Sequence, residues 1–374
     1  MNGKKWKEIT WSSFLSLFGE SYFKRNKCQM MMVLILSKNM FYSQMLRGSM
    51  TAIMRAVVVR EFGGVKKMKV ETDMPAPSVG DHEVLIKMHA SGVNPVDTYI
   101  REGMYAVLPE LPYVPGKDGA GVVEALGTKV TKFKLEDRVF CSSTSRHGTL
   151  GRLATFPEAA VFPLGGNLSF EEGACLGIPY FTAYRALVQK ASAKKGERLL
   201  VHGASGGVGL AAVQLGRELG LQVVGTAGTD EGISLVKETG AHDVFNHRDP
   251  KYLKKLGAEK FDIIIEMLAN VNLGNDLTLM NPRGRTIVVG SRGATEINPR
   301  NLMQCESAVM GVALGTATAE EVAEVSAAVV AGIKAGWVKP KVHKVYSHDE
   351  AAQAHHDIIH NKGAQGNLVV RVAE

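Results

Sequence analysis

The stretch Leu199-Leu-Val-His202-Gly203-Ala-Ser-Gly206-Gly207-Val-Gly209 decides the fold of this 374-residue chain. Its apolar beginning is typical of a buried strand, and its glycines form G-x-x-G-x-x-G, a variant of the dinucleotide fingerprint. Gly206 and Gly207 allow backbone N–H groups to approach a diphosphate, and Gly209 allows a following helix to pack close to the strand. That helix, expected over residues 208–219, turns its positive N-terminus toward the anion.

Apolar runs and helical runs alternate after this loop. The alternation predicts strands at residues 199–202, 222–226, 243–246, 262–267, 285–290 and 308–314, with helices at 208–219 and 231–239 among the crossovers. Six buried strands with helical crossovers indicate an α/β fold with a doubly wound parallel sheet, the Rossmann architecture.

The end of the second strand bears on the choice of cofactor. NAD-preferring folds place Asp or Glu there to bind the ribose 2′-hydroxyl. This chain has the neutral Val224-Gly-Thr-Ala-Gly-Thr229, with no Arg or Lys evident, and Asp230 is expected to cap the next helix. The missing carboxylate favours NADPH.

The remaining segments suggest a second folding unit. Short β segments broken by Gly and Pro occupy 54–175, and a helix and a final strand at 368–372 occupy the tail. We predict an N-terminal extension at 1–53, a mostly-β catalytic domain at 54–175, an NADP-binding domain at 176–315 and a return to the catalytic domain at 316–374.

Charge and cysteine content limit the function classes. The net charge is +7, but residues 1–53 hold eight basic and two acidic residues, which leaves 36 basic and 35 acidic residues for the rest. A nearly neutral body argues against a nucleic-acid-tracking surface. Scattered cysteines without a C-x-x-C pair indicate reduced thiols and a cytoplasmic location, and the apolar run at 30–36 is too short to span a membrane.

Residues 1–53 leave two interpretations open. Their basic, acid-poor composition fits a mitochondrial presequence. The alternative is a start assigned upstream of the natural one, Met50 or Met54, because a strand-like run begins at Arg55.

Several longer stretches resemble the zeta-crystallin type of quinone oxidoreductase, within the medium-chain dehydrogenase/reductase superfamily. The resemblance covers nearly all of 54–374. It rests most specifically on Ser91-Gly-Val-Asn-Pro-Val-Asp-Thr-Tyr-Ile100, Gly177-Ile-Pro-Tyr-Phe-Thr-Ala-Tyr-Arg185, Val201-His-Gly-Ala-Ser-Gly-Gly-Val-Gly209, Ile265-Glu-Met-Leu-Ala-Asn-Val-Asn272 and Val288-Val-Gly-Ser-Arg-Gly293.

The resemblance implies a GroES-like catalytic domain beside the Rossmann domain, with the cofactor between them. It implies catalytic roles for Tyr99 and Asn94 on the substrate side. Cofactor contacts are implied for Tyr99, Ser205, Gly206, Gly207, Val208, Gly228, His247, Asn272, Val289, Gly290, Ser291, Arg292, Val312, Ala313 and Leu314. The alternative for His247 is an ordinary loop position. The alternative for Asn94 and Asp97 is a cap at the end of a strand.

The zinc-dependent relatives differ at three positions. They carry Cys in the segment that here ends at Asn94, and a His–Glu pair where this chain has Lys117-Asp118. Without a thiolate and an imidazole there, a catalytic zinc with three protein ligands cannot form at these positions. We therefore expect no metal.

The resemblance implies NADPH-dependent quinone reduction, by hydride or by single-electron transfer, in a homo-oligomer (a dimer or a tetramer). An NADPH-dependent reductase of α,β-unsaturated carbonyls is the enzymatic alternative, and weak RNA binding or a structural crystallin-like role is the alternative from another class. Two departures from the family pattern bear on the site: the atypical segment 146–153, and Gly366-Asn367 where relatives have Gly-Lys.

Overall fold

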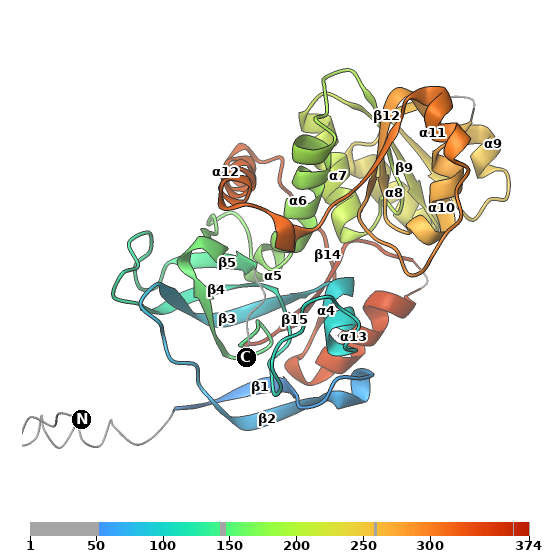
Figure 1. The fold of residues 1–374 in the computed structure, drawn as a ribbon. Coiled ribbons are helices and arrows are strands. Elements are labelled where there is room, and N and C mark those ends of the chain that lie inside the picture. Colours follow the sequence, from blue (N-terminus) through green and yellow to red (C-terminus); the bar gives the residue numbers. More distant parts are fainter. Residues whose placement is uncertain (1–51, 143–146, 258–259, 362, 374) are drawn as a thin grey trace, which may run out of the picture. The chain divides into compact units, whose positions relative to one another are not determined.

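The computed structural model describes residues 52–142, 147–257, 260–361 and 363–373. Residues Ile53–Glu374 form one compact unit (Figure 1). The predicted extension at 1–53 lies outside the described residues except for its last two positions. No helix among the described residues is long and apolar enough to cross a membrane.

Among the described residues, six parallel strands form the sheet that the glycine-loop sequence predicts. They are β8 (Arg198–Val201), β9 (Gln222–Ala227), β10 (Asp243–Asn246), β11 (Phe261–Glu266), β12 (Met280–Val288) and β13 (Ala308–Gly311). Their order is β10-β9-β8-β11-β12-β13, so the order in which strands are added reverses between β8 and β11, next to the glycine loop. The doubly wound Rossmann sheet is confirmed.

Helices connect these strands. They are α7 (Gly207–Glu218), α8 (Asp230–Thr239), α9 (Tyr252–Leu256), α10 (Ala269–Asp276) and α11 (Pro299–Cys305). An added Cβ at Gly216 of α7 would lie 2.9 Å from side-chain atoms of Leu199 and Val223, so the helix packs tightly on β8 and β9. The described structure caps α8 with Thr229, whose hydroxyl accepts from Gly232 N. The cap predicted at Asp230 is therefore wrong by one residue.

A second, mostly antiparallel sheet contains both early and late segments of the chain. Its order is β14-β15-β3-β4-β5-β7, with β6 paired to β3. The strands are β3 (Glu83–Val93), β4 (Asp118–Leu126), β5 (Arg138–Ser142), β6 (Leu153–Pro157), β7 (Val161–Pro163), β14 (Val342–Tyr346) and β15 (Asn367–Arg371). A hairpin, β1 (Ile53–Val59) with β2 (Met68–Pro75), completes the strands of the described residues. The domain boundaries at 175/176 and 315/316 remain a prediction.

The two sheets share one hydrophobic core. Helices α6 (Gly177–Tyr184) and α12 (Ala319–Ala335) contribute to it, and it contains Phe140 of the second sheet together with Leu199 of the first. Helices α4 (Pro95–Arg101), α5 (Phe170–Gly173) and α13 (Ala351–His360) belong with the antiparallel sheet. This hydrophobic cluster therefore has members in both sheets.

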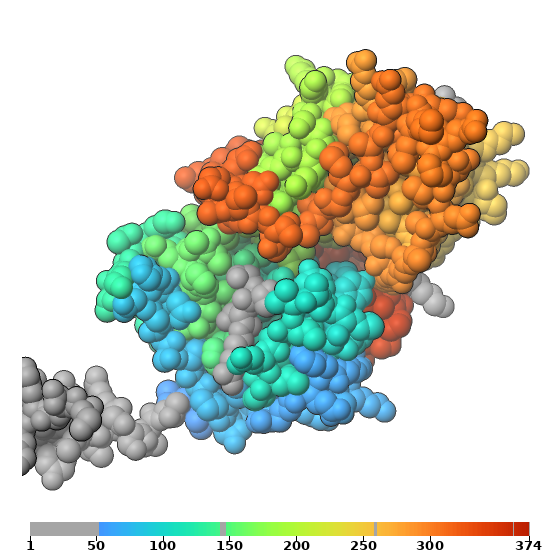
Figure 2. All heavy atoms as spheres, in the orientation of Figure 1, coloured from blue at the N-terminus to red at the C-terminus, as the bar shows by residue number. Residues whose placement is uncertain are grey.

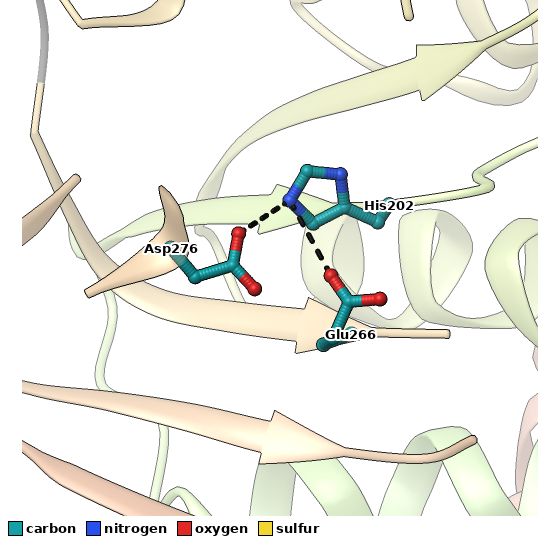
Figure 3. A group of neighbouring side chains, drawn as sticks. All are labelled: His202, Glu266 and Asp276. Atoms are coloured by element: carbon teal, nitrogen blue, oxygen red, sulfur yellow. Dashed lines mark hydrogen bonds and ion pairs between the residues drawn. The ribbon is translucent and has the colours of Figure 1, made fainter. Parts of the chain in front are cut away.

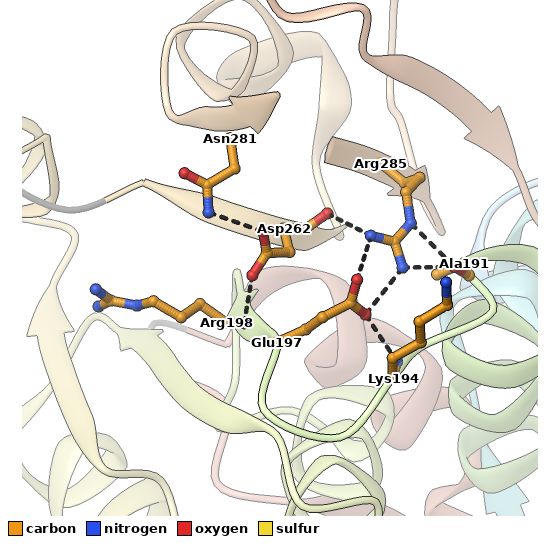
Figure 4. A network of polar contacts seen from close by, with 7 residues as sticks. All are labelled: Ala191, Lys194, Glu197, Arg198, Asp262, Asn281 and Arg285. Carbon is orange, nitrogen blue, oxygen red and sulfur yellow. Dashed lines mark hydrogen bonds and ion pairs between the residues drawn. The ribbon is translucent and has the colours of Figure 1, made fainter. Parts of the chain in front are cut away.

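An ionic network joins the amino ends of the parallel strands (Figure 4). Arg285 at β12 donates to both carboxylate oxygens of Glu197, at 2.9 and 3.0 Å, and to the carbonyl oxygens of Ala191 and Asp262. The Asp262 carboxylate accepts from Arg198 N and from Asn281 Nδ2, each at 2.8 Å. The network therefore lies at the edge of the sheet opposite to the glycine loop, which stands at the carboxyl ends of the strands.

Candidate active site

The glycine loop begins where β8 ends. Gly203 has φ +56°, a left-handed conformation that favours glycine, and Gly206 stands at the N-cap of α7 without a capping side chain. An added Cβ at Gly209 would lie 2.4 Å from the carbonyl oxygen of Gly203, so the close packing predicted for Gly209 is confirmed. Because Gly206 has no side chain to cap the helix, the first backbone N–H groups of α7 stay available to an anion at its N-terminus.

The C-terminal strand contacts this loop directly. Gly366 N donates to Ser205 O at 2.7 Å, and Gly206 pairs with Gly366 in an isolated bridge. An added Cβ at Gly207 would lie 2.2 Å from Asn367 Oδ1. The packing of Asn367 against the loop thus requires glycine at position 207, independently of any ligand. Asn367, where relatives have Lys, therefore lies beside the glycine loop.

The tip of β9 meets the loop that follows β10. Because Ala227 pairs with Asn246, the next residues of the two strands adjoin. An added Cβ at Gly228 would lie 2.6 Å from His247 Nε2 and 2.9 Å from Arg248 Nε. Desolvation and the neighbouring Arg248 charge lower the pKa of His247. The sequence of the β9 tip alone does not reveal this arginine, because it lies in the loop after the neighbouring strand β10.

The turns after β11 and β12 carry most of the other implied contacts. Glu266, the last residue of β11, accepts Asn272 Nδ2 at 3.2 Å on its side chain and Val289 N at 2.8 Å on its carbonyl. Ser291 Oγ donates to Gly293 O at 2.9 Å, and Arg292 N donates to Asn270 Oδ1 at 2.9 Å.

The end of β13 lies beside these turns. Val312 N donates to Val288 O at 3.1 Å, and Ala313 precedes the short helix Leu314–Thr316. Because parallel strands end at one edge, the structure brings the following implied residues to the carboxyl edge of a single sheet: Ser205, Gly206, Gly207, Val208, Gly228, His247, Asn272, Val289, Gly290, Ser291, Arg292, Val312, Ala313 and Leu314.

The position where zinc-dependent relatives place ligands holds a buried polar network. Asp118, the first residue of β4, accepts from Asn94 Nδ2 at 2.9 Å, from Ser142 Oγ at 2.6 Å and from Ile178 N at 2.8 Å. Burial raises the pKa of Asp118 to about 6, although these hydrogen bonds oppose the rise. An added Cβ at Gly177 would lie 2.3 Å from Asp118 Oδ1. One carboxylate thus joins the ends of three strands to the start of α6.

Asn94 is both the N-cap of α4 and a member of this network. Its backbone N donates to Asp97 Oδ2 at 2.9 Å, and its side chain is 6% exposed. Asn94 thus occupies a capping position at the start of α4, and its side-chain amide donates to Asp118. Tyr99 lies on the same helix, partly exposed, and Lys117 Nζ lies 5.9 Å from the ring centroid of Tyr105.

A groove of about 1170 Å³ opens beside the network. It is lined by Lys117, Ser142, Ile178 and Phe181 at the network, and by Leu314 at the end of the parallel sheet. In Figure 2 the deep orange surface that follows β13 adjoins the green surface of the antiparallel sheet. The groove therefore connects residues of both sheets.

Part of the atypical segment lies within the protein interior. Arg146 is outside the described residues, but Thr149 and Leu150 are buried. Thr149 Oγ1 lies 2.6 Å from Ser91 Oγ, and Leu150 O accepts from His348 Nε2 at 2.9 Å. The segment after residue 146 thus supports the strand that precedes Asn94.

Comparisons with known proteins identify the family of this chain. Family models of the zinc-binding dehydrogenases and of the alcohol dehydrogenase GroES-like domain match residues 207–331 and 80–166. The human quinone oxidoreductase is 52% identical over 322 residues, which are 85% of this chain and 98% of that protein.

Solved structures agree. A quinone oxidoreductase of Pseudomonas syringae superposes with a TM-score of 0.77 at 27% identity, over 85% of this chain and 99% of that one. A mycobacterial protein solved in complex with NADPH gives 0.77 at 29% identity, over the same shares. The chain therefore belongs to the quinone oxidoreductase family of the medium-chain dehydrogenase/reductase superfamily, and it is a nicotinamide-dependent oxidoreductase with a GroES-like domain.

Proposed function

We propose that this protein reduces quinones with NADPH, in a site that does not use zinc. The observation that carries the choice of cofactor is the position of Arg248, whose side chain lies next to Gly228 at the tip of β9. A guanidinium is a bidentate partner for a phosphate, and this tip offers no carboxylate to a ribose hydroxyl. A 2′-phosphate placed there would be attracted by Arg248.

The carboxyl edge of the parallel sheet suits the rest of the dinucleotide. The glycine loop gives a backbone surface without side chains at residues 206 and 207, and α7 directs its positive end there. We assign cofactor contacts to the implied residues on this edge, from Ser205 to Leu314, and to Tyr99 from α4. When bound, the nicotinamide supplies the hydride.

The substrate side is assigned to Tyr99 and Asn94. A quinone is flat and largely apolar and needs little more than a slot with a donor near its oxygen. The groove is lined by Phe181 and Leu314 together with residues of α12 and of the segment 157–164, so it offers a largely apolar wall. Asp118 accepts from the Asn94 amide and holds it in one orientation at the N-terminus of α4.

The residues at the zinc position do not fit that metal. Asn94 offers an amide that already donates to Asp118, and Lys117 is a cation. The nearby Cys141 is fully buried, burial raises its pKa well above the ordinary value, and its thiol donates to Gly119 O. A neutral thiol is a poor zinc ligand, because the thiolate is the binding form.

The test uses chelator-dialysed protein. Quinone reduction should continue undiminished with NADPH and should be much slower with NADH at the same concentration. Equal rates with the two cofactors would contradict the assignment of Arg248, and activity that returns only with added zinc would contradict the zinc-free site.

A further inference from the structure

Three ionisable side chains meet where β8 ends and the glycine loop begins (Figure 3). His202 follows β8, Glu266 ends β11 and Asp276 ends α10, and all three are buried. His202 Nε2 lies 2.8 Å from Asp276 Oδ1 and 3.6 Å from Glu266 Oε2. The sequence analysis assigned no role to this His202–Glu266–Asp276 cluster.

The carboxylate oxygens of the cluster are unequally satisfied. Glu266 Oε1 accepts from Leu268 N and from Asn272 Nδ2, and Asp276 Oδ1 is bonded to His202. Within the described part of the chain, Glu266 Oε2 and Asp276 Oδ2 have no hydrogen-bond partner although both are buried. One proton held between these two oxygens would satisfy both, because a protonated carboxyl donates to a charged one.

The charges around the cluster favour that proton. Burial raises the pKa of Glu266 to about 7, with Asp276 adding to the rise and His202 opposing it. Burial alone would lower the pKa of His202, but Asp276 and Glu266 raise it above the ordinary value. The other titratable groups that sense the cluster are His247, which follows β10, and Tyr252 of α9.

The cluster is connected to the segments assigned to the cofactor. His202 directly precedes Gly203, and Glu266 holds Leu268 N and Asn272 through its carboxylate and Val289 N through its carbonyl. Ala269 N in turn donates to Gly290 O at 2.9 Å. Glu266 therefore shapes both turns that follow β11 and β12.

We propose that Glu266 is a positioning residue for the cofactor, and that NADPH binds more tightly when the cluster holds its shared proton. The proposal rests on the proposed function. With His202 charged and one proton between the carboxylates the cluster is neutral, and without that proton it carries one net negative charge. Because NADPH is a polyanion bound at the same sheet edge, it is repelled by the deprotonated cluster.

A metal centre fits the cluster less well than a proton. Ligand atoms around a tetrahedral zinc lie about 3.4 Å apart, given zinc–ligand distances of about 2.1 Å, and four ligands are usual. The described residues supply three, and the 2.8 Å separation of His202 and Asp276 is a hydrogen-bond distance.

The experiment is a fluorescence titration of NADPH between pH 6 and pH 8 on the full chain and its variants. If bound NADPH raises the pKa of the cluster by about one unit, the wild-type Kd should rise about fivefold over this range. Glu266→Gln keeps an acceptor oxygen for Leu268 N and Asn272 and stays neutral. It should bind at pH 8 as the wild type does at pH 6, with a flat profile, whereas Glu266→Ala should bind weakly at every pH.

Asp262→Asn is the matched control, because it changes an acid to its amide at the other end of β11, in the network of Figure 4. It should keep the wild-type pH profile. His247→Asn separates the titration of His247, and repeating the titration with NADH removes the 2′-phosphate as a source of the slope. Both should leave a slope that Glu266→Gln abolishes.

The inference would be overturned by a wild-type slope in Glu266→Gln, or by equal Kd values for Glu266→Gln and Glu266→Ala. A stoichiometric metal that is present in the wild type and lost in Glu266→Gln would also overturn it, in favour of a metal centre. A wild type that binds no NADPH at any pH would instead refute the proposed function on which the inference rests.

Discussion

Replacing Arg248 by Ala should weaken NADPH binding while leaving NADH binding nearly unchanged. Arg248 adjoins Gly228 at the β9 tip, where the 2′-phosphate is assigned. A hydrogen bond to a charged group contributes about 1.5–3 kcal/mol, and solvent exposure of this arginine reduces the figure to about 1–2 kcal/mol. That loss corresponds to a rise in the NADPH Kd of about 5- to 30-fold.

The assay is a fluorescence titration of both reduced cofactors at two salt concentrations. Because the interaction is with an exposed charge, the wild-type preference for NADPH should shrink between about 0.01 M and 0.1 M salt, as the Debye length falls from about 30 Å to about 10 Å. Arg248→Lys keeps the charge and should retain part of the preference. If Arg248→Ala lost NADH and NADPH affinity equally, Arg248 would have a structural role and the assignment would be refuted.

Three further predictions concern stability, pH and the substrate side. Asp118→Ala leaves the donors of Asn94 and Ser142 unpaired and should lower the free energy of unfolding by about 3–5 kcal/mol, measured by denaturant titration, with Asp118→Asn costing less; equal stability would show that the network is dispensable. Burial raises the pKa of Asp97 from 3.8 to about 7, so the folded state retains a proton that the unfolded state releases. The free energy of unfolding should therefore fall from about pH 4 to about pH 7, and Asp97→Asn should reduce this slope, to which Asp118 and Glu266 also contribute; an unchanged slope would contradict the prediction. Tyr99→Ala should slow quinone reduction and weaken NADPH binding, by about 1–3 kcal/mol if a buried hydrogen bond is lost; wild-type values of both would remove Tyr99 from the site.

The sequence predicted the parallel sheet well because its strands are continuous apolar runs next to glycine turns. Even there the helix boundary was displaced, since Thr229 and Asp230 are both good capping residues and only the backbone decides between them. The distinction between NADPH and NADH was read from the β9 tip alone. The charge that supports it, Arg248, comes from the loop after the neighbouring strand β10, and only strand order places it there.

The buried ionic groups could not be predicted for a related reason. His202 and Asp276 are separated by 74 residues. The sequence around each residue gives no sign that its side chain is buried beside another charged group. One signal was present: Glu266 ends the apolar run Phe261–Glu266, and a charged residue inside a buried strand needs a partner. Identifying that partner required the fold. The same holds for Asp118, because the sequence showed only that this position lacks the ligand found in zinc-dependent relatives.

The most direct test of the account is the rate of NADPH oxidation by the metal-free protein with three acceptors: a quinone, an α,β-unsaturated ketone and a simple saturated ketone. Residual metal is measured in the same preparation. We predict fast turnover with the quinone, little with the saturated ketone, and no dependence on zinc, because Asn94, Lys117 and Asp118 stand where zinc-dependent relatives carry metal ligands. Faster turnover with the unsaturated ketone than with every quinone tried would contradict it and would identify the protein as an enone reductase.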